Sequence, residues 1–337
     1  MEDAAKIKNE NVLLEIRDLR TTFYDRDRKI EAVRGVNLKV NAGEILGIVG
    51  ESGSGKSVMM RSIMGMLSQN AKIDKGEIIL CGSHLEKLPE REKRMIRGRE
   101  IAMIFQDPMT ALDPLKKIGY HIEEVLIRNK HMSRAAAREN AISFLKMVGI
   151  PSPEKRINQY PHELSGGMRQ RVMIAMALSS SPKLLIADEP TTALDVTIQA
   201  QILELLKKLK DENNMSVILI SHDLGVVASL CSRIAVMYAG MIMEEGTADE
   251  IFYSPRHPYT KALLDSIPSI DIDAVKRLKP IRGNAPSLID PPNGCPFAER
   301  CDIAEDRCKS SMPEYKSFSP THRCMCFLAD KGVKCDV

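Results

Sequence analysis

The chain has 337 residues, of which 44% are hydrophobic and 28% charged, a balance typical of a globular protein with enough apolar material for a core. Its 48 Lys and Arg against 45 Asp and Glu leave a net charge of only +3, which excludes a polyanion-binding surface over the whole molecule, so nucleic acid is not an expected partner. No apolar run approaches the roughly 20 residues that cross a bilayer, and the charged start lacks the apolar core of a secretory signal, so we expect neither feature.

Residues 12–246 alternate β-rich runs with helical stretches, which indicates an α/β sheet with crossover helices. From Asp107 to Ser165 the strand signal gives way to helical periods, with Ser133 as an N-cap, so we expect a helical subdomain inserted at about 107–180. The clearest predicted strands are 43–50, 77–80, 101–105, 183–188, 216–220 and 233–238. Several of these runs are apolar on both faces, as buried parallel strands are.

A phosphate-binding pattern, GESGSGKS, runs from Gly50 to Ser57 between the strand over 43–50 and a helix predicted over 56–67. Its glycines let backbone N–H groups turn toward phosphate oxygens, because a Cβ would block that approach. Lys56 supplies a mobile positive charge for the β- and γ-phosphates, and Ser57 a hydroxyl for Mg²⁺. The residues expected at the nucleotide from this segment are Gly50, Ser52, Gly53, Gly55, Lys56, Ser57 and Val58.

Two acids end the apolar strand predicted over 183–188. Asp188 can hold the metal ion near the phosphates. Glu189, one residue later, can order and polarise the attacking water as a general base. Together with the phosphate pattern, these acids predict hydrolysis of a magnesium-bound nucleoside triphosphate.

A further motif, LSGGM with Ser165, Gly166 and Gly167 at its centre, is followed by Arg-Gln-Arg. It resembles the signature motif of the nucleotide-binding subunits of ABC transporters. That resemblance implies a P-loop NTPase fold: an ABC cassette with a RecA-like core sheet, an antiparallel β subdomain and a helical subdomain. It also implies ATP as the nucleotide, Gln106 as the Q-loop glutamine at the Mg²⁺ site, and His222 as the switch histidine that contacts the γ-phosphate.

The same resemblance implies an aromatic platform for adenine near the chain start. Phe23 and its neighbour Tyr24 are the two candidates. Successive strand residues point opposite ways, so only one of them can stack on the base, and the sequence leaves the choice open.

The family works as a pair of cassettes, in which the signature motif of one chain completes the phosphate site of the other. One cassette is present here, so the resemblance implies a second ATPase subunit, identical or paralogous, supplied in trans. It further implies that the helical subdomain transmits motion to two integral membrane permease subunits.

Six of the eight cysteines crowd into residues 295–337, and in a chain without an export signal this favours metal ligation over disulfides. Cys295, Cys301 and Cys308, with Cys324 or Cys326 as a fourth ligand, suit either Zn²⁺ or an iron–sulfur cluster. The spacing alone leaves the metal open.

The segment CPFAERC, together with HPYTKALLDSIP at 257–268, resembles the C-terminal extension of dipeptide and oligopeptide ABC importer ATPases. That resemblance implies a small, loop-rich metal-binding extension with a 4Fe-4S cluster, zinc being the alternative. Placing His322 on the family's His-x-x-x-Cys pattern selects Cys326 as the fourth ligand, although Cys324 competes.

These patterns identify the chain as a member of the peptide-importer ATPases, with the cassette over 1–250 and the extension over 251–337. The resemblance implies a peripheral subunit at the cytoplasmic face of the membrane, linked only indirectly to an extracytoplasmic peptide-binding protein. Three alternatives remain: an importer ATPase for nickel or glycosides, a soluble ABC ATPase acting on DNA or the ribosome, and a redox-regulated interaction module built on the cysteine tail.

Overall fold

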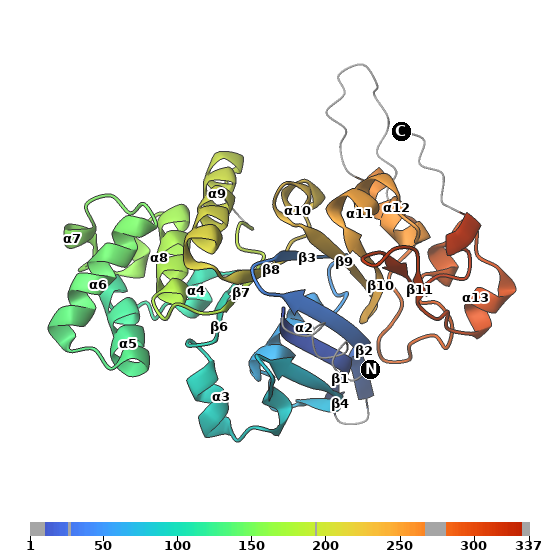
Figure 1. Ribbon diagram of the computed structural model, residues 1–337, viewed down its shortest axis with the longest axis horizontal. Helices are drawn as coiled ribbons and strands as arrows, with labels where there is room; N and C mark the ends of the chain where they lie inside the picture. The colour runs from blue at the N-terminus through green and yellow to red at the C-terminus, as the bar shows by residue number, and fades with distance from the viewer. Residues whose placement is uncertain (1–10, 26–27, 193, 267–280, 332–337) are drawn as a thin grey trace, which may run out of the picture. The chain divides into compact units, whose positions relative to one another are not determined.

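The computed structural model describes residues 11–25, 28–192, 194–266 and 281–331 (Figure 1). These residues form two compact units. The first holds residues 87–220 with short segments before residue 14 and at 41–44, and the second holds residues 14–40, 45–86 and those after 220.

The first unit is built on three parallel strands in the order β6 (Ile101–Ile104), β7 (Leu184–Asp188) and β8 (Ser216–Ile220). Every residue of these strands is buried, which explains why the sequence is apolar on both faces there. The strands predicted over 101–105, 183–188 and 216–220 are confirmed.

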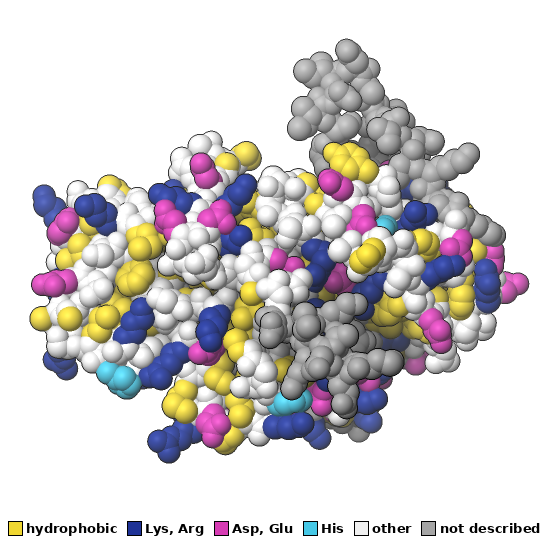
Figure 2. Space-filling view, in the orientation of Figure 1, with side chains coloured by type: hydrophobic (Ala, Val, Ile, Leu, Met, Phe, Trp, Pro, Cys, Tyr) yellow, Lys and Arg dark blue, Asp and Glu magenta, His cyan; other side chains and the backbone are white. Residues whose placement is uncertain are grey.

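Helices fill the rest of this unit. The pair α5 and α6 pack against each other and both contact α8, and Ser133 caps α6 by accepting a hydrogen bond from the Ala136 N–H (3.3 Å). Acidic and basic side chains are scattered among hydrophobic and uncharged ones over the displayed face of α5–α7 (Figure 2). The helices are α3 (Glu90–Ile96), α4 (Pro108–Ala111), α5 (Ile118–Lys130), α6 (Arg134–Met147), α7 (Pro153–Arg156), η3 (Pro161–Glu163), α8 (Gly166–Leu178) and α9 (Val196–Asn213).

The second unit contains a four-stranded sheet in the order β2-β1-β4-β5, with β4 antiparallel to both of its neighbours. The strands are β1 (Val12–Asp25), β2 (Arg28–Asn41), β4 (Ala71–Leu80) and β5 (Ser83–His84). The run over 77–80 is thus the end of a longer strand. This is the antiparallel β element that the family resemblance implies.

A second sheet of this unit carries β3 (Ile45–Val49) parallel to β9 (Arg233–Tyr238), followed by three antiparallel neighbours. These are β10 (Met241–Thr247), β12 (Arg323–Cys324) and β11 (Lys316–Ser317). Residues 316–317 and 323–324 are therefore hydrogen-bonded into the same sheet as β3. The remaining elements are α2 (Lys56–Met64), η2 (Leu85–Lys87), α10 (Leu224–Leu230), α11 (Ala248–Tyr253), α12 (Pro258–Asp265), η4 (Ala298–Arg300), α13 (Asp306–Ser310) and η5 (Ala329–Lys331).

None of the helices in the described part of the chain is long and apolar enough to cross a membrane.

Candidate functional site

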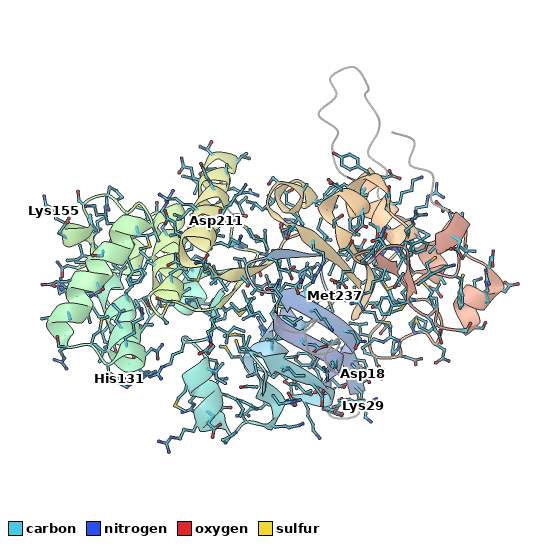
Figure 3. The ribbon with its side chains drawn as sticks, viewed as in Figure 1. Asp18, Lys29, His131, Lys155, Asp211 and Met237 are labelled. Atoms are coloured by element: carbon cyan, nitrogen blue, oxygen red, sulfur yellow. The ribbon has the colours of Figure 1, made fainter. Side chains whose placement is uncertain are left out.

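The predicted phosphate loop connects β3 to α2 and is tightly enclosed at its two ends. Gly50 has φ +151, and a Cβ there would lie 2.0 Å from the carbonyl oxygen of Met237 on β9 (Figure 3). Gly55 has φ +100, and its Cβ would lie 2.3 Å from the carbonyl oxygen of Ala32. At both positions a side chain would collide with the backbone of a neighbouring strand, so glycine is required there. The sequence alone does not show this cause.

The tip of the loop has a different character. Gly53 has φ +77 with open space around its Cβ position, so conformation and not crowding favours glycine there. Ser52 and Gly53 are exposed, whereas Lys56 is buried. Ser57 and Val58 follow in the first turn of α2.

The ammonium group of Lys56 folds back over the loop. It donates hydrogen bonds to the carbonyl oxygens of Gly50 (2.7 Å) and Glu51 (2.8 Å) and to the Ser54 hydroxyl (3.2 Å). The positive charge therefore lies inside the loop at the N-terminus of α2, where both the helix dipole and the ammonium favour an anion.

His222 lies beside the strand that leads into this loop. The preceding residue, Ser221, donates its N–H to the carbonyl oxygen of Ile48 on β3 (3.3 Å), and the His222 side chain is exposed. The second unit thus brings the predicted switch histidine and the phosphate loop to the same end of β3.

In the first unit, the side chains of Gln106 and Glu189, two of the predicted site residues, are hydrogen-bonded to each other. The Gln106 amide donates to a Glu189 carboxylate oxygen (2.9 Å), and the Thr192 hydroxyl donates to the same oxygen (3.0 Å). Glu189 adopts a left-handed backbone conformation, φ +47, directly after buried Asp188 at the end of β7. Strained backbone of this kind is retained mainly at functional positions. Thr192 opens residues 192–195, which by sequence resemble the family's D-loop; the bond from its hydroxyl to Glu189 is an additional contact that this resemblance did not specify.

The signature residues open helix α8. Ser165 is its N-cap, with Oγ accepting from the Met168 N–H (3.4 Å). A Cβ on Gly167 would lie 2.8 Å from a methyl group of Ile198 on α9, whereas on Gly166 the nearest atom would be 3.6 Å away. Gly167 is needed for helix packing, and Gly166 is not.

The aromatic pair near the chain start lies at the end of β1. Tyr24 is 40% exposed, donates its hydroxyl to Asp74 (2.8 Å) and has the ammonium of Lys29 5.9 Å from its ring centroid (Figure 3). Phe23 is half-buried and pairs with Ala71 of β4. Both side chains keep some exposed surface, and the choice between them stays a prediction.

Four of the C-terminal cysteines line one small pocket: Cys295, Cys301, Cys308 and Cys326. Cys324 is fully buried on β12 and does not line it. No group of three or more His, Cys, Asp or Glu side chains is arranged to hold a metal ion within the residues that the structure covers. Burial raises the pKa of Cys295 to about 12 and that of Cys326 to about 11, so these thiols stay protonated unless a bound cation favours the thiolate.

His257 lines the same pocket and has an unsatisfied hydrogen-bond donor. Its Nδ1 accepts from the Tyr259 N–H (3.0 Å), which leaves the ring proton on Nε2. The ring is buried, burial lowers its pKa to about 4, and Nε2 has no hydrogen-bond partner in the described part of the chain. A sulfur-rich acceptor in the pocket would satisfy this donor, so the donor set suits a thiolate-bound group.

Comparison with known proteins agrees with these motifs. Two family profiles match: ABC transporter over residues 33–192, and oligopeptide/dipeptide transporter, C-terminal region, over residues 243–308. The oligopeptide transport ATP-binding protein OppD of Bacillus subtilis is 53% identical, covering 92% of this chain and 87% of the relative. The dipeptide transport ATP-binding protein DppD of the same organism is 51% identical, covering 96% of each chain.

The chain belongs to the ATP-binding subunits of the oligopeptide/dipeptide ABC transporter family. Its enzymatic activity is ATP hydrolysis. Among solved structures, the dimeric bacterial ABC transporter cassette MJ0796 has a TM-score of 0.64 and 33% identity, and covers 70% of this chain and 98% of its own. A structure of the same cassette bound to ADP and Pi gives a TM-score of 0.64 with 32% identity. The predicted ABC cassette fold is thereby confirmed.

Proposed function

We propose that this subunit powers the import of dipeptides or oligopeptides through two separate membrane permease subunits. The observation that carries the proposal is the match of residues 243–308 to the C-terminal region of peptide transporters, joined to about half-identity with peptide-transport ATPases over nearly the whole chain. The cassette over 1–250 hydrolyses ATP, and 251–337 form the extension. The chain lies at the cytoplasmic face of the membrane and does not itself contact the peptide.

The proposed roles of the site residues follow from their places in each unit. Gly50, Lys56 and the first turn of α2 hold the phosphates; Ser57 and Asp188 are each proposed as a ligand of Mg²⁺. Glu189 positions and polarises the attacking water. The Gln106 amide already orients the Glu189 carboxylate, which supports placing Gln106 at the metal and water site. His222 contacts the γ-phosphate.

The signature residues Ser165, Gly166 and Gly167 are proposed to act on nucleotide bound by a second cassette, because the N-terminus of α8 offers N–H donors to an anion. The dimeric state of the similar MJ0796 cassette supports this arrangement. The second cassette is either a further copy or a paralogue.

Transport is tested by copurifying the chain from membranes with its companions and reconstituting the complex in vesicles with the cognate binding protein. Uptake of radiolabelled di- or oligopeptide that depends on ATP supports the proposal. Uptake of nickel or glycosides in place of peptide would show that the transporter has a different cargo. Copurification with ribosomes or DNA in place of membrane proteins would refute a role in transport.

We further propose that Cys295, Cys301, Cys308 and Cys326 hold a 4Fe-4S cluster, zinc being the alternative. Their common pocket and the unsatisfied His257 Nε2–H support this set. A bound cluster would cross-link three parts of the extension and stabilise it. Anaerobic purification followed by iron, sulfide and zinc analysis tests the proposal; stoichiometric zinc without iron, or metal-free thiols, would contradict it.

A further inference from the structure

Glu51 places a carboxylate in the loop proposed to receive the phosphates of ATP. The other three variable positions of the pattern, Ser52, Gly53 and Ser54, carry no charge. An unpaired carboxylate at this site would repel bound phosphate, and in a partly buried site the repulsion is weakly screened. The charge on Glu51 therefore needs compensation.

Arg300 of the C-terminal extension provides that compensation. Its two terminal nitrogens donate to the two carboxylate oxygens of Glu51 at 2.7 and 2.9 Å. The partners lie 249 residues apart in sequence, and only 6% of the Arg300 side chain is exposed. A bidentate pair of this kind is both strong and directional.

The guanidinium is held in place by groups other than Glu51. Nε donates to the carbonyl oxygen of Arg282 (2.8 Å), and Nη1 also donates to the Tyr238 hydroxyl (3.0 Å). The group lies 5.7 Å from the ring centroid of Tyr238 and 5.8 Å from that of Phe297. Residues of the extension and of β9 thus fix the position of the Arg300 guanidinium, and the Glu51 side chain is oriented by its bonds to this fixed group.

A second contact holds the Glu51 backbone. The Glu51 N–H donates to the hydroxyl of Tyr259 on α12 (2.9 Å), and Tyr259 is fully buried. Main chain and side chain of the same loop residue are therefore held by residues that follow the cassette motifs in sequence.

The position of Arg300 along the chain connects this contact to the cysteine pocket. Arg300 ends the short helix η4 and immediately precedes Cys301, in the segment from Cys295 to Cys301. A rearrangement of that segment would move the cation away from the carboxylate.

We propose that Arg300 is a positioning residue of the nucleotide site, which neutralises and orients Glu51 so that MgATP affinity depends on the folded state of the cysteine segment. The inference rests on the proposed assignment of residues 50–57 as the phosphate loop. It concerns a contact within one unit of the chain and requires no second cassette.

The test measures equilibrium binding of MgATP to the full-length chain by calorimetry. Arg300→Gln leaves Glu51 uncompensated, and we expect about tenfold weaker binding; Arg300→Lys, which keeps the charge but loses the bidentate geometry, should lie between it and wild type. Glu51→Gln should bind within about threefold of wild type. The double variant should resemble Glu51→Gln and not Arg300→Gln, because the repelling charge is gone.

Lys316→Gln serves as the matched control, since it removes an exposed ion pair with Asp330 elsewhere in the extension and should leave affinity unchanged. Arg300→Gln binding like wild type, or a double variant as weak as Arg300→Gln, would overturn the proposal. Loss of binding in Lys56→Ala checks the loop assignment separately: if that variant binds normally, the phosphate loop itself is misassigned.

The link to the cysteine segment has its own measurement. Cys301→Ser should weaken MgATP binding in the wild-type background and have at most a small effect in the Glu51→Gln background. Equal weakening in both backgrounds would show that the cysteine acts on overall stability and not through Arg300, and iron content measured on the same samples keeps this result separate from the cluster proposal.

Discussion

Glu189 combines three properties at the scale of a single residue. Its backbone is in the left-handed region, one oxygen accepts from both Gln106 and Thr192, and it directly follows the acid proposed to bind Mg²⁺. The two donors on one oxygen hold the carboxylate in a defined orientation. This geometry suits a general base with a defined orientation.

Glu189→Gln should retain MgATP binding within about twofold and lose about 10²–10⁴-fold in turnover, the usual contribution of a positioned acid–base group. The amide preserves the shape but cannot accept the proton. Binding calorimetry and steady-state ATPase assays on the same preparation separate the two effects, with Glu204→Gln on the exposed face of α9 as control. Hydrolysis near the wild-type rate would remove Glu189 from this role.

His121 gives the helical part of the first unit a defined pH dependence. Burial lowers the pKa of its imidazole below the ordinary value of 6.5, and the hydrogen bond to the Asp113 carbonyl (3.3 Å) only partly opposes this. The unfolded chain therefore takes up a proton near pH 6.5 while the folded chain does not, so stability is complete above that pH and falls as the pH drops below it.

Urea unfolding at pH 7.5 and 5.5 measures this effect. Wild type should lose more stability between the two pH values than His121→Gln, whereas His131→Gln, which alters an exposed histidine (Figure 3), should behave as wild type. An identical pH dependence in His121→Gln would show that another group is responsible.

At the scale of elements, the phosphate loop is shaped by two strands that flank it. A Cβ on Gly50 or Gly55 would overlap the backbone of β9 or β2, whereas a Cβ on Gly53 would meet no atom within 4 Å. The three glycines of one motif therefore differ in what they contribute to stability.

Gly50→Ala should destabilise the fold by about 3 kcal/mol or more, because the new methyl group overlaps the Met237 carbonyl and backbone must move. Gly53→Ala should cost only about 1 kcal/mol, the strain of a left-handed alanine. Chemical denaturation of the two variants without nucleotide gives the comparison. Similar losses for both would mean that the β9 contact is not what requires glycine at position 50.

The elements that the sequence predicts well are those with a local signal. The buried strands β6, β7 and β8 read as continuous apolar runs, and the phosphate loop has a specific pattern. By contrast, β1 and β2 alternate irregularly between buried and exposed residues, so their length was not apparent. The pairing of β10 with β12 joins Glu244 to Cys324, and no local pattern announces a contact across about 80 residues.

At the scale of the whole molecule, local motifs can be recognised in the sequence, whereas contacts between residues far apart in the chain cannot. Each site residue could be named from its motif, yet the pairing of Glu51 with Arg300 depends on how the chain end folds back onto the loop. The only local indication of this pair in the sequence is the acid within the phosphate loop, because a carboxylate next to bound phosphate is stabilised by a nearby cation.

Gly166 of the signature motif offers a test of the proposed pairing of two cassettes. On Gly166 a Cβ would make only an ordinary contact, 3.6 Å from Leu194, so this chain tolerates a side chain there. Gly166→Asp should therefore fold and bind MgATP as wild type, yet place a negative charge where the partner's γ-phosphate is proposed to lie. We expect ATPase activity of the assembled complex to fall about 100-fold.

Ser143→Asp adds the same charge on the exposed face of α6 and should leave both binding and hydrolysis unchanged. The decisive comparison is between the isolated chain and the complex. A defect in MgATP binding by isolated Gly166→Asp would place the signature motif at the chain's own nucleotide, and full activity in the complex would exclude it from the interface. If isolated Gly166→Asp binds MgATP normally but the complex that contains it loses ATP hydrolysis, only a site completed in trans explains the result.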